Sequence, residues 1–394
     1  MTSYPLSEEH QALRDTVAEF AHTVVQPVIG GYYERAEFPY ELIARMAKLG
    51  LFGLPFPEEY GGMGGDLFAL GLALEELARV DSSVAITLEA AVALGAMPIY
   101  RFGTDEQRRR WLPELCSGER LAAFGLTEAG GGTDIPGGMR STARLAGATW
   151  VIDGSKSFIT NAGTSITALV TVLAVTGEAA GPGRREISAI VVPSGTPGFS
   201  VGPEYSKVGW CASDTRELAF TSCRVPADHL LGPRGRGYAQ FLEILDEGRV
   251  AIAALATGLA QGCLDECLRY VAERTAFGQP LGQFQATQFK VADMAARVHV
   301  ARLAWYDAAA RLVAGEPAKQ QAAMAKLVAS NAAMDNARDA TQLFGGYGFM
   351  NEFPVARFYR DAKVLEIGEG TSEVQRMIIA RELGLRHGPP GDSA

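Results

Sequence analysis

The sequence predicts an α+β protein with a helical domain at each end and a β-domain between them. Residues 1–120 carry apolar residues at helical spacing, and residues 121–231 carry short β-rich runs separated by turn residues. Residues 232–394 return to long, alanine-rich helical segments. The chain of 394 residues is also longer than one hydrophobic core normally serves. We therefore expect three domains with these boundaries.

Composition and charge exclude several classes of protein. With 47% hydrophobic and 21% charged residues, the chain has the composition of a soluble globular protein. No apolar run approaches the roughly 20 residues that span a bilayer, and the polar start is unlike a signal peptide. The net charge of −9 argues against nucleic-acid binding. The five cysteines include no C-x-x-C pair, which predicts a reduced, cytoplasmic protein. The five histidines are scattered along the chain, so no metal site is expected.

The N-terminal domain is expected to be all-helical, and the sequence marks several of its helices. Ser7 opens the first, whose apolar stripe is Leu13, Val17, Phe20 and Val24. Pro39 and Gly50 bracket the second, whose inward-facing residues are Leu42, Ile43, Met46 and Leu49. The third runs from about Asp66 to Val80. Thr104 and Gln107 form a capping box for the fourth, which reaches Ser117.

Turn residues divide the central domain into short strands. Asp153-Gly154 between two β-rich runs is a strong hairpin-turn signal. A Gly/Pro segment at 177–183 separates two further strands. The expected strands cover 150–152, 157–160, 168–176, 187–192 and parts of 198–225. Regular short strands of this kind are typical of a sandwich or barrel.

Long helical patterns occupy the C-terminal domain. They cover 241–273, 285–314 and 318–343, and each exceeds the mean helix length. Three or four such helices with short connections predict a helical bundle.

The loop at 366–373 carries the strongest candidate for catalysis. Glu369 stands between Gly368 and Gly370, just before an apolar helical run. Thr371 is a plausible N-cap for that helix, and Glu373 lies in its first turn, where the helix dipole favours negative charge. Glycine on both sides allows another molecule to approach the backbone. Glu369 is therefore either a general base or part of a capping turn.

Other glycine-rich stretches are candidates for holding a cofactor. Residues 124–134 combine three consecutive glycines with two threonines, which suits either an anion-binding loop or a surface loop. Phe158 and Thr160 pair an aromatic ring with a hydroxyl, although a core Phe is the simpler reading. Arg274 and Gln342 lie beside glycines and could contact a pyrophosphate. The glycines at 232–237 and 345–348 fit no G-x-G-x-x-G within a βαβ unit, so a Rossmann domain is rejected.

Taken together and in this order, these motifs resemble those of the acyl-CoA dehydrogenases over about residues 4–385. The resemblance implies a helical domain, a β-domain and a C-terminal four-helix bundle. It also implies FAD as the cofactor, a homo-oligomer (a tetramer or dimer), and an electron-transfer flavoprotein as the oxidant. The implied activity is α,β-dehydrogenation of a short or branched acyl thioester.

The resemblance also implies roles for individual residues. Glu369 matches the catalytic base. The residues that match FAD contacts within one subunit are Phe124, Leu126, Thr127, Thr133, Phe158, Thr160, Thr371 and Glu373. Those that match FAD contacts across a subunit interface are Arg274, Phe277, Gln285, Gln342 and Gly346. Those that match substrate positions are Thr133, Asp246, Arg249, Gly368 and Gly370.

The sequence departs from the family pattern at three positions. Ala129 replaces a Pro, Phe158 stands where Trp is common, and Gly368 replaces a Tyr that often precedes the base in straight-chain members. The smaller Gly368 predicts a deeper or differently shaped acyl pocket. Relatives that hold the base on a helix have it at the position of Gly248, which carries no carboxylate here.

Two other functions are compatible with the motifs. The thioester could be carried by an acyl carrier protein in secondary metabolism instead of by CoA. Some members of the family bind DNA and protect it from alkylation, but the net charge of −9 argues against a basic DNA-binding surface.

Two opposite effects on the pKa of Glu369 are expected. Burial should raise this pKa and the N-terminus of the following helix should lower it, and the sequence does not show which effect is larger.

Overall fold

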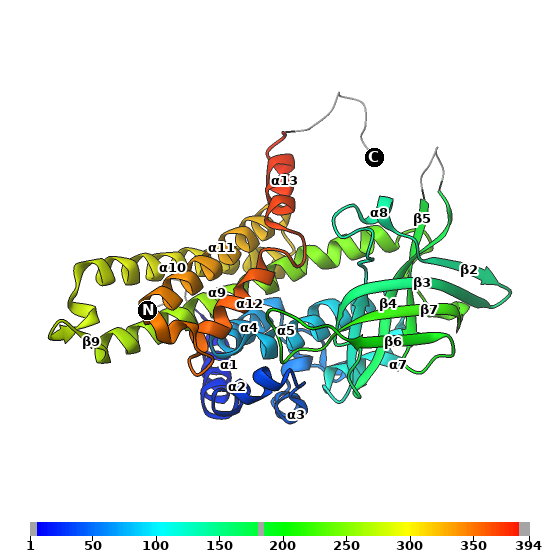
Figure 1. The fold of residues 1–394 in the computed structure, drawn as a ribbon. Helices are drawn as coiled ribbons and strands as arrows, with labels where there is room; N and C mark the ends of the chain where they lie inside the picture. The colour runs from blue at the N-terminus through cyan, green and yellow to red at the C-terminus, as the bar shows by residue number, and fades with distance from the viewer. Residues whose placement is uncertain (1–5, 180–184, 386–394) are drawn as a thin grey trace.

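The computed structural model describes residues 6–179 and 185–385, which form helices at both ends of the chain and a sheet between them. In Figure 1 the sheet lies at one end of the molecule, and the hairpin of helices α9 (Gly237–Glu273) and α10 (Gln285–Val313) reaches to the other. Part of the Gly/Pro segment expected at 177–183 lies outside the described residues. The three-part α+β fold predicted from the sequence is confirmed.

The N-terminal part is helical throughout. Its α-helices are α1 (Glu8–Phe20), α2 (Gln26–Arg35), α3 (Tyr40–Lys48), α4 (Leu67–Val80), α5 (Ser82–Glu89), α6 (Met97–Phe102) and α7 (Asp105–Cys116). Ser7 accepts a hydrogen bond from the His10 N–H at 3.1 Å, as an N-cap should. Thr104 and Gln107 form the reciprocal capping box. One expectation is wrong: Leu49 is 37% exposed, because α3 ends at Lys48 and the chain turns at Gly50 with φ of 74°.

The central part forms one eight-stranded sheet. Its strands are β1 (Leu121–Gly125), β2 (Thr142–Ala146), β3 (Thr149–Thr160), β4 (Thr167–Glu178), β5 (Arg185–Pro193), β6 (Phe199–Glu204), β7 (Thr215–Pro226) and β8 (Leu230–Leu231). The order is β6-β7-β3-β2-β4-β5-β8, and β1 pairs with β4 in parallel. Apolar residues of β3 and β7 share a core with residues of β4 and β5, so the sheet bends over its own interior. The short helix α8 (Ile135–Gly138) follows the glycine-rich loop after β1.

The hairpin predicted at Asp153-Gly154 is wrong. Both residues lie inside the 12-residue strand β3, where the register with β7 shifts. Gly154 has a φ of 143°, and a Cβ there would lie 2.4 Å from Ser141 Oγ. Asp153 accepts a hydrogen bond from the Ser222 N–H at 2.6 Å. The dipeptide therefore forms a bulge, and the chain reverses instead at Gly147, between β2 and β3.

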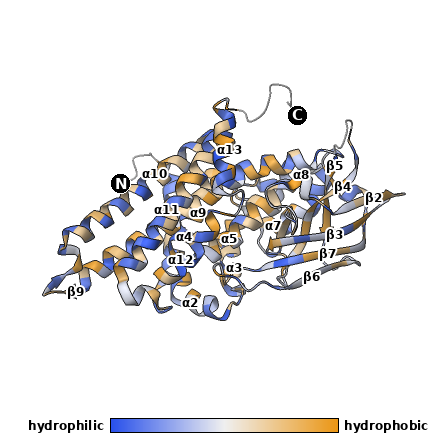
Figure 2. Cartoon of the chain, turned by 45° about the horizontal axis from the view of Figure 1, so that its top comes forward, coloured by the Kyte–Doolittle hydropathy of each residue, from blue (hydrophilic) through white to orange (hydrophobic). Residues whose placement is uncertain are grey.

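The C-terminal part consists of α9 (Gly237–Glu273), α10 (Gln285–Val313), α11 (Lys319–Phe344), α12 (Pro354–Leu365) and α13 (Ser372–Glu382). The two-residue strands β9 (Thr275–Ala276) and β10 (Gln279–Pro280) form the turn between α9 and α10. Apolar residues run along α9 and the strands of the sheet in Figure 2. One continuous core includes residues of α1, α4, α5, α9, α10 and α11.

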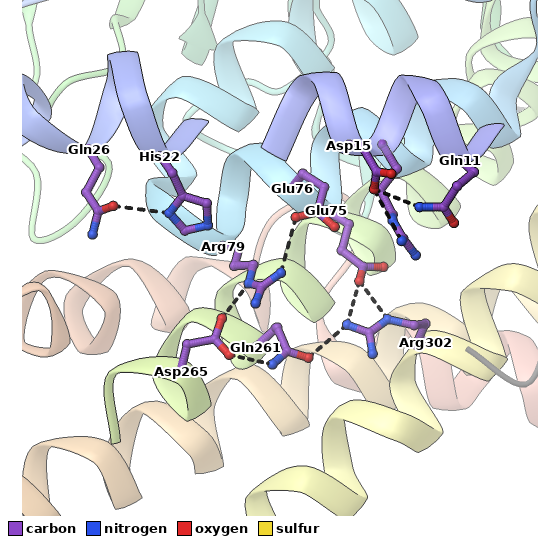
Figure 3. Close-up of polar contacts among 11 residues, drawn as sticks. Gln11, Asp15, His22, Gln26, Glu75, Glu76, Arg79, Gln261, Asp265 and Arg302 are labelled. Carbon is purple, nitrogen blue, oxygen red and sulfur yellow. Dashed lines mark hydrogen bonds and ion pairs between the residues drawn. The ribbon is translucent and has the colours of Figure 1, made fainter. Parts of the chain in front are cut away.

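A chain of hydrogen bonds joins the two helical parts (Figure 3). It begins at the buried Glu75 of α4, which accepts from Arg302 Nε of α10 at 2.7 Å. Arg302 also donates to Gln261 of α9, which donates to Asp265. Arg79 of α4 donates to Asp265 and closes the chain. Three helices are thereby held at fixed positions by charge-assisted bonds.

A second buried carboxylate joins all three parts of the chain. Asp361 of α12 accepts from Tyr33 Oη of α2 at 2.6 Å, from Ser82 Oγ of α5 at 2.7 Å and from the Trp210 N–H at 2.7 Å. Trp210 lies between β6 and β7. Burial, followed by the neighbouring Asp81, raises the pKa of Asp361 to about 6.

The expectation that no apolar run approaches a membrane span needs correction, because two helical stretches, Ser82–Phe102 and Gly237–Glu273, are long and apolar enough to cross a membrane by length and composition alone. Their most apolar windows are 94% and 89% buried inside the protein, as expected for helices of a core.

Candidate active site

Glu369 lies in the loop between α12 and α13. Thr371 caps α13 by accepting from the Val374 N–H at 3.3 Å, as predicted. Glu369 has a φ of 51°, in the left-handed region that non-glycine residues rarely occupy, and Gly370 follows with a φ of 92°. A backbone of this kind at an ionisable residue is typical of functional sites.

The carboxyl group of Glu369 points toward α9. A Cβ built on Gly248 would lie 2.3 Å from Glu369 Oε2 and 3.3 Å from Leu94. Both carboxyl oxygens are inaccessible to solvent, although the residue as a whole is partly exposed. The absence of a side chain at Gly248 is therefore what makes room for this carboxyl group.

A second carboxyl group, that of Glu89 on α5, faces Glu369. Glu89 is fully buried, and apart from each other the two carboxyls have no hydrogen-bond partner within residues 6–179 and 185–385. Burial raises the pKa of Glu89 well above its usual value, and the charge of Glu369 raises it further. Burial also raises the pKa of Glu369, while a hydrogen bond from Glu89 and the charges of Lys326 and Arg249 oppose that rise. Burial therefore disfavours two negative charges in this pair, and the larger rise in pKa favours Glu89 as the protonated partner, with its O–H facing the Glu369 carboxylate.

Two predicted substrate residues, Asp246 and Arg249, lie on α9 near this pair. Arg249 is 4% exposed and forms an ion pair with Asp246. Burial raises the pKa of Asp246, and Arg249 opposes the rise. Arg249 Nε is buried without a partner in the described part of the chain, so it has an N–H to offer to a ligand. Thr133 is also a predicted substrate residue, and it is exposed on the glycine-rich loop before α8.

One group of predicted cofactor residues is brought together at the sheet. The Ser157 N–H donates to the Thr127 carbonyl at 2.9 Å, which places the loop after β1 beside the end of β3. Phe158 is 65% exposed with a φ of 63°, so the simpler reading of it as a core residue is wrong. Thr127 and Thr160 are half-buried. Phe124 and Leu126 are each 8% exposed. An exposed ring beside two hydroxyls suits a planar polar cofactor.

A buried ion pair fixes the loop of this first group. Lys156, fully buried in β3, donates to Glu128 Oε1 at 2.8 Å and to the Leu126 carbonyl at 3.3 Å. Glu128 also accepts from the N–H groups of Arg140 and Ser141 at 2.6 and 3.0 Å. These hydrogen bonds fix the position of the loop relative to β3, and they depend on the charges of both Lys156 and Glu128.

The second group of predicted cofactor residues includes Arg274 and Phe277, which flank β9, and β9 lies at the opposite end of the molecule from the sheet (Figure 1). The guanidinium of Arg274 lies 5.8 Å from the ring centroid of Tyr347. Phe277 is 97% exposed, and the remaining members, Gln285, Gln342 and Gly346, are also exposed. Within one chain the two groups are not brought together.

Three buried ionisable residues at this site escaped the sequence analysis. Glu89 stands in an apolar helical run, and Lys326 stands in an alanine-rich helix, where a lysine usually points to solvent. Lys156 lies in a strand that was expected to break at Gly154. A charged residue at an apolar position of the helical pattern is the one signal that could have revealed Glu89.

Comparison with known proteins follows the same three-part division. Family models described as the N-terminal, middle and C-terminal domains of acyl-CoA dehydrogenase match residues 7–119, 123–223 and 235–384. A probable acyl-CoA dehydrogenase of Bacillus subtilis, YngJ, is 46% identical over 97% of this chain and 99% of its own. Butyryl-CoA dehydrogenase of Megasphaera elsdenii superposes with a TM-score of 0.93 at 40% identity, covering 97% of this chain and 99% of its own. A chain solved in work on the electron transferring flavoprotein of Acidaminococcus fermentans gives 0.93 at 42% identity, with the same coverage.

Proposed function

Because the chain belongs to the acyl-CoA dehydrogenase family, we propose that it catalyses FAD-dependent α,β-dehydrogenation of a short or branched acyl thioester. The observation that carries this proposal is the buried carboxylate of Glu369, held on a left-handed backbone between two glycines. The similarity to a butyryl-CoA dehydrogenase supports a short acyl chain. We expect the protein to act in the cytoplasm.

Glu369 is the base in this proposal. Its carboxylate takes the α-proton of the thioester, and the electrons left on the α-carbon form the new double bond as the β-hydrogen leaves. FAD, when bound, supplies the acceptor for that β-hydrogen as hydride. The Glu369 N–H supports the enolate oxygen, as the family resemblance implies. Burial of the carboxylate favours the uptake of a proton, because it raises the pKa of Glu369.

The exposed ring of Phe158 and the hydroxyls of Thr127 and Thr160 fit the flavin of FAD. Arg274 and Gln342 would hold the pyrophosphate end. Since these two residues lie at the other end of the same chain, we propose that a second copy supplies them and that the protein is a homo-oligomer. An electron-transfer flavoprotein is the proposed oxidant, supported by the similarity to a chain from such a system.

The acyl pocket is proposed to open at Gly368. Its chain neighbours aside, a Cβ built there would have one atom of the described residues within 4 Å, the Val364 carbonyl oxygen at 3.5 Å. The space beside the base is therefore open to a substituted or branched acyl group. Arg249 and Thr133 would hold the thioester arm, which CoA and acyl carrier proteins share.

The test is anaerobic bleaching of the purified flavoprotein by a panel of acyl-CoA and acyl-carrier-protein thioesters. We expect a short or branched acyl-CoA to reduce the flavin fastest. We expect Glu369→Gln to keep FAD and the fold but to reduce at a rate lower by about 10²–10⁴-fold, since an amide cannot accept the proton. Near-normal reduction in this variant would refute the assignment of the base. Faster reduction by the carrier-protein thioester would identify the carrier as protein-bound.

A further inference from the structure

Lys326 is a fully buried lysine beneath the loop that carries Glu369. It lies on α11, which packs against both α12 and α13. Its Nζ donates to the Gly370 carbonyl at 2.9 Å, and this is its one hydrogen bond within residues 6–179 and 185–385. A buried ammonium with one neutral acceptor is costly unless a negative charge lies nearby.

Among the negative charges around Lys326, that of Glu369 has the largest electrostatic effect on it. Burial lowers the pKa of Lys326 to about 8, and Glu369 is the largest influence that opposes this fall. In return, Lys326 is the first charge that lowers the pKa of Glu369. The two charges therefore stabilise each other although no direct ion pair joins them.

The Gly370 carbonyl is the point where this contact meets the strained backbone. Gln375 Nε2 donates to the same carbonyl at 2.8 Å and to the Glu369 carbonyl at 3.3 Å. Ser330, one turn further along α11, donates to the Leu365 carbonyl at 2.8 Å. The loop is thus held against α11, and Lys326 supplies a cationic contact at the residue directly after the base.

We propose that Lys326 is a positioning residue, which holds the left-handed backbone at Glu369 through the Gly370 carbonyl and keeps a positive charge beside the buried carboxylate. This inference rests on the proposed role of Glu369. The other charged groups that face the pair are Glu89 from α5, Arg249 with Asp246 from α9, and Glu366 and Glu373 from the loop and α13.

The test compares three variants of α11 in the holoenzyme. Lys326→Met removes the charge and the donor, Lys326→Gln keeps a donor without the charge, and Ser330→Ala is the matched control that removes an uncharged anchor. Loss of the cation raises the pKa of Glu369, so less carboxylate is present at a given pH. We expect the pH profile of anaerobic flavin reduction to move to higher pH in both Lys326 variants, with a rate at pH 6.5 lower by about tenfold or more. Ser330→Ala should keep the wild-type profile.

A second measurement does not depend on activity. Denaturation midpoints are compared for Lys326→Met, Glu369→Gln and the double variant. In the Glu369→Gln protein the buried Lys326 has lost its counter-charge and is therefore more costly than in the wild type. If the charges interact, Lys326→Met raises the denaturation midpoint more in the Glu369→Gln protein than in the wild type. Additive midpoints together with a wild-type pH profile in both Lys326 variants would overturn the proposal. Normal reduction by Glu369→Gln would instead overturn the proposed function itself.

Discussion

The carboxyl group of Glu89 faces the carboxyl group of Glu369, and no other group within residues 6–179 and 185–385 donates a hydrogen bond to either. Two buried carboxylates without donors would repel each other strongly, so one of them keeps its proton. The pair therefore places a neutral acid against the proposed base.

The first prediction concerns this pair. Glu89→Met removes the hydrogen bond that lowers the pKa of Glu369, so that pKa should rise and the acid limb of flavin reduction should move to higher pH. Glu89→Gln still offers an N–H and should keep a profile closer to the wild type. The measurement is the rate of anaerobic reduction from pH 5.5 to 9. Identical profiles in Glu89→Met and the wild type would show that the two carboxyls do not interact.

The second prediction concerns Gly248. A methyl group there would lie 2.3 Å from Glu369 Oε2, so Gly248→Ala should displace the carboxylate and slow reduction by about tenfold or more. Glu369→Gly removes the clash, and adding Gly248→Glu to it should restore part of the rate from the neighbouring helix. Stopped-flow reduction of the four proteins checks this. A fully active Gly248→Ala protein would mean that the carboxylate points elsewhere during turnover.

The third prediction concerns assembly. Arg274→Ala should weaken FAD retention by about tenfold or more, because it removes a charge-assisted contact that a second subunit is proposed to supply. Arg269→Ala, which removes a cation paired with Glu266 on the same helix, is the control. Flavin absorbance after gel filtration measures retention and mass together. The idea fails if a monomer retains stoichiometric FAD.

The fourth prediction concerns the acyl pocket. Gly368→Tyr should cut turnover of the best substrate by about tenfold or more and spare FAD, because its ring would occupy the space beside the base. Gly368→Ala should have a much smaller effect. Turnover and flavin content are measured for the same preparations. A wild-type preference for long straight-chain acyl-CoA would contradict the pocket argument.

The fifth prediction concerns Asp361. Its pKa is about 6 in the folded protein and 3.8 ordinarily, so between these values the folded state binds more protons than the unfolded state. Its contribution to the free energy of unfolding is therefore largest below about pH 4 and falls as the pH rises through 6. Asp361→Asn cannot titrate, so the stability difference between wild type and variant should narrow by roughly 1–3 kcal/mol from pH 4 to 6.5. Denaturant titrations at several pH values check this, and a constant difference would contradict it.

Periodicity and capping signals were sufficient for most of the fold. Ser7, Thr104 and Thr371 cap helices as predicted, because a cap depends on residues within one turn. The hairpin turn predicted at Asp153-Gly154 was wrong because this dipeptide occurs both in turns and in bulges. Contacts with Ser141 and Ser222 decide which of the two forms here. Those partners are distant in sequence, so no local pattern contains the answer.

The candidate site likewise contains residues that the local sequence identified and residues that it could not identify. Glu369 was identified from its glycines and the helix after it, all within a few residues. Glu89 and Lys326 were not, because each is 40 or more residues from Glu369 and stands in a helix whose pattern is otherwise ordinary. What makes them unusual is burial beside another charge, which only tertiary packing creates.

The continuous core shared by α1, α4, α5, α9, α10 and α11 has a consequence for the order in which the chain can fold. During synthesis the first helices leave the ribosome long before α9, α10 and α11 exist, and chains grow by only about 5–20 residues per second. Throughout that interval α4 and α5 can pack against α1 and against each other, but the surface that α9, α10 and α11 will cover stays open. The β-domain has a core of its own and can close earlier. The nascent N-terminal helices are therefore the segment on which a holding chaperone would act until the last third of the chain emerges.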